Sequence, residues 1–154
     1  MACAGCLRCT PVSGHILWSG RVRVLGESTI EIEAAAYPAR EQGKGTIHFN
    51  DTAGSMAKDS VTTAASAVRA VTGKDLYDYD IHINIIGGGN IDGPSAGCAI
   101  TAALVSAVEK IPVRQDWALT GEISLSGDVK PVGGVYEKAF GARQGAMRVV
   151  LIPY

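Results

Sequence analysis

Alternating apolar and polar positions predict most of the strands in this chain. Residues 21–25 and 30–34 alternate on either side of a Gly-Glu-Ser turn, which is the pattern of a β-hairpin. A third strand is predicted over residues 46–49, just before an Asn-Asp turn signal. In residues 81–85 isoleucine alternates with polar residues, which predicts a half-buried strand.

Apolar residues spaced by three and four predict three helices, over residues 56–71, 95–109 and 135–144. Gly73 and Gly145 follow the first and the last of them, and glycine is a frequent helix C-cap. The apolar face of the first helix is predicted to consist of Val61, Ala64, Ala65, Val68 and Val71.

Three further segments complete the pattern. Residues 117–120 predict a short strand, residues 123–132 a hairpin that turns at residues 126–128, and residues 148–152 a last buried strand. Helices and strands therefore alternate without a strict β-α-β repeat. This order predicts an α/β fold of the mixed (α+β) kind with a mixed sheet.

Composition limits the class of protein. The 154 residues suffice for one domain with its own core. A formal net charge of −1 without a cluster of Lys and Arg argues against a nucleic-acid partner. No apolar run is long enough to span a membrane, and residues 1–10 lack the apolar centre of a signal peptide. We therefore expect a soluble, cytoplasmic protein with no membrane partner.

Three cysteines stand at the start of the chain. Cys3, Cys6 and Cys9 have the C-x2-C-x2-C spacing that in longer motifs holds zinc or an iron–sulfur cluster. A fourth ligand is missing unless His15 supplies it. The alternative, which we prefer, is a flexible cysteine-containing segment over residues 1–19 that binds no metal.

Two glycine-containing stretches lack the spacing of nucleotide-binding loops. Lys44 is followed by glycine, and Pro38 stands where a phosphate-binding loop has its first glycine. The glycines at residues 87–89 are followed by Asp92, where the last glycine of a dinucleotide fingerprint should be. We therefore predict no nucleotide cofactor.

Ser95 lies where the strand at residues 81–85 passes through a glycine-rich loop into the next helix. The first N–H groups of a helix have no partner within it, and they suit an oxyanion or a phosphate. The alternative is that Ser95 only caps the helix, because serine is a preferred N-cap and Gly-Pro often precedes a helix start. Cys98, on the same apolar helix, is expected to be a small core residue.

Two stretches of the chain resemble the proteolytic domain of the Lon proteases. The first reads Asp-Gly-Pro-Ser-Ala-Gly and ends at Gly97. The second combines Thr-Gly-Glu with Pro-Val-Gly-Gly-x-x-Glu-Lys and ends at Lys138. The resemblance runs from about Gly20 to Pro153. It implies a compact two-layer domain over residues 20–154, C-terminally short for the family.

This resemblance implies a Ser-Lys catalytic dyad, with Ser95 as the nucleophile and Lys138 as the base. Such a dyad works only if the lysine is neutral, because an ammonium group has no lone pair to accept a proton. Burial lowers the pKa of a lysine, and apolar neighbours in its helix indicate that the Lys138 amine turns inward. From the residues alone, the solvated face of an amphipathic helix is the alternative place for this lysine.

Further site residues follow from the same resemblance. Thr120 is expected to orient the lysine amine, or otherwise to serve as a capping or turn residue, and the N–H groups of Ser95 and Ala96 to bind the oxyanion. Asp92 is expected to be a site neighbour that reaches the lysine or caps its loop. The histidines do not suit a Ser-His-Asp triad, and His82, inside a strand, is expected to be structural.

The implied function is that of a serine endopeptidase that cleaves unfolded or damaged proteins. It would act without ATP by itself, or as the proteolytic part of an ATP-dependent Lon. Its partners would be polypeptide substrates, further copies of the chain in a homo-hexamer, and a separate ATPase domain. One alternative is a catalytically impaired Lon-fold fragment that serves as an oligomerisation or binding module. The other is a metal-binding protein organised by its N-terminal cysteines.

Overall fold

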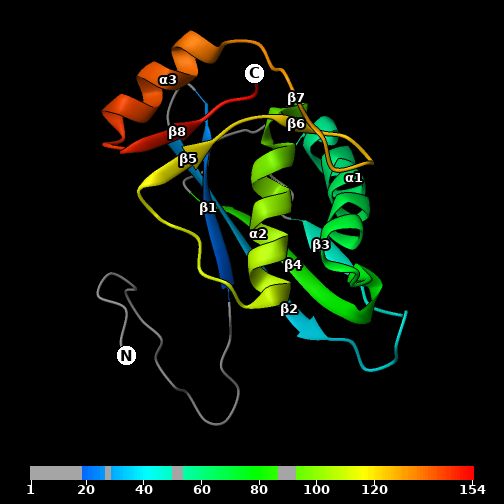
Figure 1. Cartoon of the computed structure of the whole chain (residues 1–154). Coiled ribbons are helices and arrows are strands. Elements are labelled where there is room, and N and C mark those ends of the chain that lie inside the picture. Colours follow the sequence, from blue (N-terminus) through cyan, green and yellow to red (C-terminus); the bar gives the residue numbers. More distant parts are fainter. Residues whose placement is uncertain (1–18, 27–28, 50–53, 87–92) are drawn as a thin grey trace, which may run out of the picture.

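The computed structural model describes residues 19–26, 29–49, 54–86 and 93–154. Within them, the main sheet is formed by β1 (Ser19–Leu25), β2 (Thr29–Pro38), β3 (Ile47–Phe49), β4 (Tyr79–Ile86), β5 (Trp117–Leu119) and β8 (Val149–Leu151). Their spatial order is β3-β4-β2-β1-β5-β8 (Figure 1). The β1/β2 and β2/β4 pairs are antiparallel, whereas β3/β4, β1/β5 and β5/β8 are parallel. The predicted mixed sheet and mixed α/β fold are confirmed.

The remaining described elements match the helices and the second hairpin predicted from the sequence. They are α1 (Ser55–Thr72), η1 (Leu76–Asp78), η2 (Pro94–Ala96), α2 (Gly97–Glu109), α3 (Val135–Gln144), and the short pair β6 (Glu122–Ile123) and β7 (Val129–Lys130). Helix α1 ends at Gly73, which adopts the left-handed conformation with φ of 73° and donates its N–H to the Arg69 carbonyl. Helix α3 ends before Gly145 as predicted.

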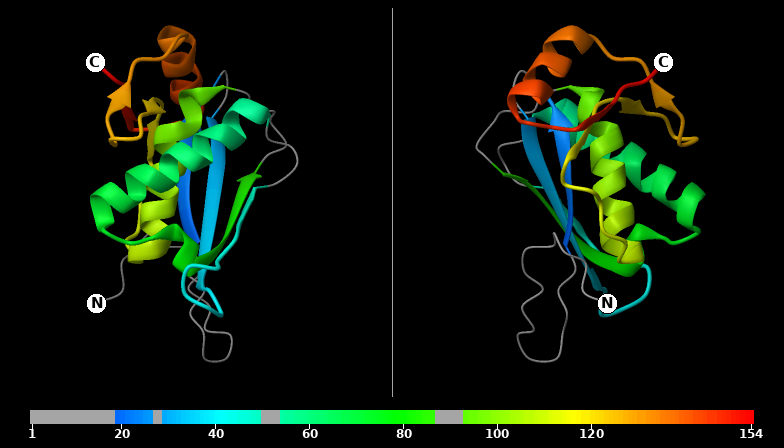
Figure 2. Two further views of the ribbon diagram at one scale, coloured as in Figure 1. Left: turned by 90° about the vertical axis from the view of Figure 1, so that its right-hand side faces the viewer. Right: turned by 60° about the vertical axis from the view of Figure 1, so that its left-hand side comes forward.

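Alternate residues of the central strands form the main core against α1 and α2. The strand residues on this face are Val22, Val24, Ile32, Ala34, Ile81, Ile83 and Ile85, and each is buried. The register places them together, since Val22 pairs with Ile32 and Ile32 with Ile85. Figure 2 shows α1 and α2 on one side of the sheet. Full burial of a valine or isoleucine side chain contributes about 1.5–3 kcal/mol to the free energy of unfolding. Residues of α2 pack in the same cluster, which holds the helix against the sheet.

Gly20 allows β1 to approach α2 closely. A Cβ atom on Gly20 would lie 2.8 Å from Ser106 Cβ and 3.0 Å from Ala107 N, and it would also meet the Ala103 carbonyl oxygen. We expect Gly20→Ala to lower the free energy of unfolding by about 2 kcal/mol or more, because helix and strand must separate. Gly133→Ala is the matched control, since nothing lies within 4 Å of a Cβ there. Urea unfolding measures both, and equal midpoints would contradict the expectation.

Helix α3 packs on the opposite face of the sheet, at one end. Leu25 alternates with Val24 along β1, and Ala118 pairs with Arg23, so both side chains point away from α2. They form a smaller cluster with Ala142 of α3, joined by Met147 and Val150. The fold therefore has two layers over most of the sheet, with α3 added on the far side at one end. In Figure 1, α3 lies at that end of the sheet, next to β8.

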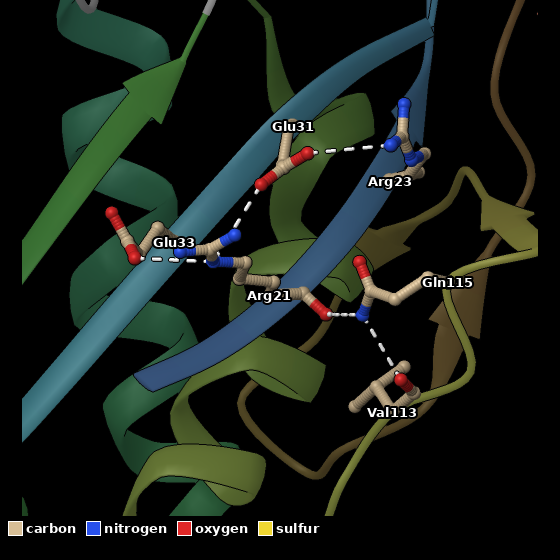
Figure 3. A network of polar contacts seen from close by, with 6 residues as sticks. All are labelled: Arg21, Arg23, Glu31, Glu33, Val113 and Gln115. Atoms are coloured by element: carbon tan, nitrogen blue, oxygen red, sulfur yellow. Dashed lines mark hydrogen bonds and ion pairs between the residues drawn. The ribbon is translucent and has the colours of Figure 1, made fainter. Parts of the chain in front are cut away.

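The rest of that far face is polar. Across β1 and β2, Arg21 Nε lies 3.2 Å from Glu33 Oε1, and Arg23 Nη2 lies 3.4 Å from Glu31 Oε2 (Figure 3). Gln115 Nε2 donates to the Arg21 carbonyl at 3.0 Å, which ties the segment before β5 to β1. Such part-exposed pairs contribute little each, about 0–1 kcal/mol, but they keep this face solvated.

Two details of the sequence analysis were wrong. Val71, placed on the apolar face of α1, is 69% exposed because the helix extends past the edge of the core there. The predicted last strand, residues 148–152, is not buried: Val149 and Val150 of β8 are half-buried, Leu151 is 45% exposed, and Ile152, which follows β8, is 51% exposed. The physical reason is its position as an edge strand, paired only with β5 among the described strands.

Candidate active site

Ser95 lies in η2, the single 3-10 turn that precedes α2. Strand β4 ends at Ile86, and the chain then passes through residues 87–92 to Gly93. The predicted strand-loop-helix junction is therefore confirmed at both ends. Asp92 belongs to the loop that lies outside the described residues, so its predicted role stays a prediction.

Capping does not explain Ser95. The N-cap of α2 is Ala96 and that of η2 is Gly93, and neither has a side-chain capping bond. The structural role of Ser95 rests on its carbonyl group instead, which accepts the Gly121 N–H at 3.0 Å. The Gly121 carbonyl in turn accepts the Cys98 N–H at 3.0 Å. These reciprocal bonds fix the start of α2 to the segment that follows β5.

Gly97 makes this attachment tight. A Cβ atom there would lie 3.1 Å from both the N and the Cγ2 atoms of Ile123 in β6. Ala96 is 1% exposed and Ser95 is half-buried. The N–H groups of Ser95 and Ala96 stand at the start of a helical segment, where backbone donors have no partner within the helix. Their predicted role as oxyanion donors stays a prediction.

Thr120 connects the serine segment with the lysine. It directly follows β5 and is 2% exposed, and its N–H donates to the Leu151 carbonyl at 3.1 Å. Its Oγ1 donates to the Ser95 carbonyl at 3.3 Å and accepts from Lys138 Nζ at 3.3 Å. One hydroxyl can make both bonds, because it has one proton and two lone pairs.

Lys138 reaches this place from α3, on the far side of the sheet. Its backbone N–H donates to the Gly134 carbonyl at 3.0 Å, and its side chain is half-buried. Burial lowers the pKa of the Lys138 amine below its ordinary value. Among the described residues, no carboxylate pairs with this amine, so no ion pair there raises its pKa against the effect of burial.

The cause of this burial differs from the one inferred from the sequence. Ala139 and Phe140, read as apolar residues that turn the amine inward, are exposed, and Phe140 is 54% exposed. Val135 is half-buried, and Ala142 is buried against the sheet. The Lys138 amine loses water because it extends round the end of the sheet towards Thr120.

The structure thus brings together Ser95, Thr120 and Lys138, which come from three separate elements. Their hydrogen bonds run through the Thr120 hydroxyl, and within the described part of the chain none joins Ser95 Oγ directly to Lys138 Nζ. Bonds between catalytic groups are often long or unformed in the absence of substrate. The sequence analysis missed Gly121, whose N–H and carbonyl groups each make one of the bonds that hold the site.

The histidines lie elsewhere. His82 alternates with the buried Ile81 and Ile83, so it faces away from α2, and its ring stacks on that of His48 with centroids 5.1 Å apart. The edge of Tyr37 contacts His82 at 6.1 Å between centroids. This surface packing agrees with a structural role.

The cysteines divide into two groups. Cys3, Cys6 and Cys9, with His15, lie outside the described residues. Cys98 packs against the core, and burial raises the pKa of its thiol, as expected for a core cysteine. In the described part of the chain, no group of three His, Cys, Asp or Glu side chains could hold a metal ion. No helix among the described residues is long and apolar enough to cross a membrane.

Comparison with known proteins shows the family to which the chain belongs. Residues 14–154 match the family model described as "Lon protease (S16) C-terminal proteolytic domain". The chain is 44% identical over 141 residues to Lon protease 2 of Bacillus subtilis (strain 168), which covers 82% of the chain and 25% of that protein. It is 40% identical over 137 residues to the Lon protease of Escherichia coli (strain K12), which covers 84% of the chain and 17% of that protein.

An archaeal relative is similar to the same degree. The archaeal Lon protease of Thermoplasma volcanium is 39% identical over 125 residues, which covers 80% of the chain and 19% of that protein. The chain therefore spans a quarter or less of the length of these three relatives.

Proposed function

Because the chain belongs to the family of Lon C-terminal proteolytic domains, we propose that it is a serine endopeptidase whose catalytic dyad is Ser95 and Lys138. One observation carries this assignment. The amine of Lys138 is partly buried, which lowers its pKa, and it is hydrogen-bonded to Thr120, whose hydroxyl also donates to the Ser95 carbonyl. A lysine that loses hydration without gaining a carboxylate partner is suited to act as a neutral base.

In the proposed reaction, Ser95 Oγ attacks the carbonyl carbon of a peptide bond while Lys138 Nζ takes the hydroxyl proton. The N–H groups of Ser95 and Ala96 donate to the oxyanion of the tetrahedral intermediate. The C–N bond then breaks, and Lys138 returns the proton to the leaving amine. Water, deprotonated by Lys138, hydrolyses the resulting ester and frees Ser95.

The substrates we propose are unfolded or damaged polypeptides, because a site at the end of a sheet receives an extended segment rather than a folded surface. We further propose a homo-hexamer in the cytoplasm. We also propose that the domain acts without ATP by itself, or as the proteolytic part of an ATP-dependent Lon beside an ATPase domain.

Thr120 is proposed as a positioning residue, which gives a separate test. Thr120→Val keeps the shape of the side chain but removes the hydroxyl that accepts from Lys138. We expect kcat/KM to fall by about 10- to 100-fold, because Lys138 becomes an ammonium group when it takes the Ser95 proton, and a hydrogen bond to a charged group contributes about 1.5–3 kcal/mol. The loss should appear in kcat rather than in KM, because Thr120 is only 2% exposed and offers almost no surface for a substrate to contact.

Thr120→Ser supplies the control, because it restores the hydroxyl and should recover most of kcat. Steady-state hydrolysis of a fluorogenic peptide measures both variants. If the valine variant keeps the wild-type kcat, Thr120 has only a packing role.

A further inference from the structure

A hollow of about 250 Å³ opens where α1, η2 and β6 meet. Its walls are Met56, Asp59, Ser60 and Thr63 of α1, Pro94 of η2, and Glu122 and Ile123 of β6. Pro94 directly precedes Ser95, so the hollow begins one residue from the proposed nucleophile. Its volume lies below the range of about 300–1,000 Å³ usual for small-molecule sites, and it suits a single side chain.

The walls combine an apolar surface with two carboxylates. Ile123 is buried, and Pro94 and Met56 extend the apolar part. Asp59 lies on the helix and Glu122 on the strand, and both are exposed. Neither pairs with a cation among the described residues. A long side chain with an apolar stem and a positive end fits this arrangement, because the stem covers the apolar wall while the charge stays near the carboxylates.

We propose that this hollow is a substrate subsite that takes a Lys or Arg side chain flanking the bond cleaved at Ser95. The inference rests on the proposed role of Ser95. It adds a sequence preference that the dyad itself does not supply. Both carboxylates are solvated, so the attraction is modest and is screened by salt, whose Debye length falls from about 10 Å at 0.1 M to about 3 Å at 1 M.

The test is a pair of fluorogenic peptides that differ only in lysine or norleucine, with this residue moved through the positions on either side of the cleaved bond. At the preferred position we expect the lysine peptide to have a kcat/KM higher by about three- to tenfold in low salt. The ratio should approach one in 1 M salt, and also in the Asp59→Asn/Glu122→Gln double variant. Asp128→Asn changes an exposed carboxylate in the same hairpin but outside the hollow, and it should keep the wild-type ratio.

Binding separates this inference from the proposed function. If wild type cleaves neither peptide, the proposed function fails, and anisotropy titration of the same labelled peptides with Ser95→Ala tests the subsite alone. A lysine preference in binding that disappears in the double variant supports the subsite. A ratio near one in both assays overturns it, as does a preference that survives in the double variant. A changed sedimentation mass of the double variant also overturns it, because the hollow would then be a contact between copies of the chain.

Discussion

Replacing Lys138 by Ala is expected to abolish cleavage of an unfolded protein such as casein, with kcat/KM at least about 10³-fold lower. Without the amine, Ser95 loses the base of the proposed dyad, and the described histidines cannot replace it because they lie on the far face of the sheet. Ser95→Ala should lose as much. Because the two residues act as one unit, the double variant should be no worse than either alone.

Three controls sharpen this prediction. Lys138→Arg keeps a positive charge and a donor for Thr120, but a guanidinium cannot become neutral in a protein, so this variant should also be inactive. Lys130→Ala removes an exposed lysine of β7 and should keep the wild-type rate. Circular dichroism should show every variant folded. A Lys138→Ala enzyme that keeps most of its rate would show that another group is the base.

The rate should also fall steeply at acid pH, by about tenfold per unit below the pKa of Lys138 in the free enzyme. The sign follows from the chemistry, because protonation converts the base into an ammonium that cannot accept the Ser95 proton. Burial lowers the pKa of Lys138, so the limb should lie at lower pH than the ordinary lysine value of about 10.4. A plot of log kcat/KM against pH, with a slope near one on its acid side, measures this.

The lowered pKa of Lys138 also makes the free energy of unfolding depend on pH. Its pKa is lower in the folded than in the unfolded chain, so between the two values the unfolded chain holds more protons. This lysine therefore makes the free energy of unfolding rise with pH through that window. At lower pH the partly buried ammonium group of Lys138 opposes folding. The burial that lowers the pKa of this lysine therefore also lowers the stability of the fold at that pH.

Local patterns predicted the elements well where the local signal and the tertiary environment agree. Helix α3 has the predicted bounds because Gly134 precedes it and Gly145 stops it. The prediction failed for β8, since an apolar run indicates an extended segment but not whether a neighbour covers it. The prediction that Val71 is buried failed for the same reason, because no described neighbour covers the end of α1 there.

The candidate site was predictable in its residues but not in its connections. Ser95, Thr120 and Lys138 stand in two motifs that resemble a known family, whereas the bond from Thr120 Oγ1 to the Ser95 carbonyl joins residues 25 positions apart. Neither that contact nor the hollow beside Pro94 has a local signal. The contact depends on how η2 packs against the segment after β5, and the hollow depends on how α1, β6 and η2 pack. The Lys138 amine is partly buried, as expected, but the apolar neighbours Ala139 and Phe140 on which that expectation rested are exposed.

The most direct test of a neutral lysine as base is kcat/KM on one short fluorogenic peptide from pH 5 to 10, for wild type and for His82→Gln. The account predicts an acid limb above the histidine range of about pH 6 to 7 and below the ordinary lysine value of about 10.4, unchanged in the His82 variant. A limb at pH 6 to 7 that disappears in His82→Gln would contradict the Ser95–Lys138 assignment.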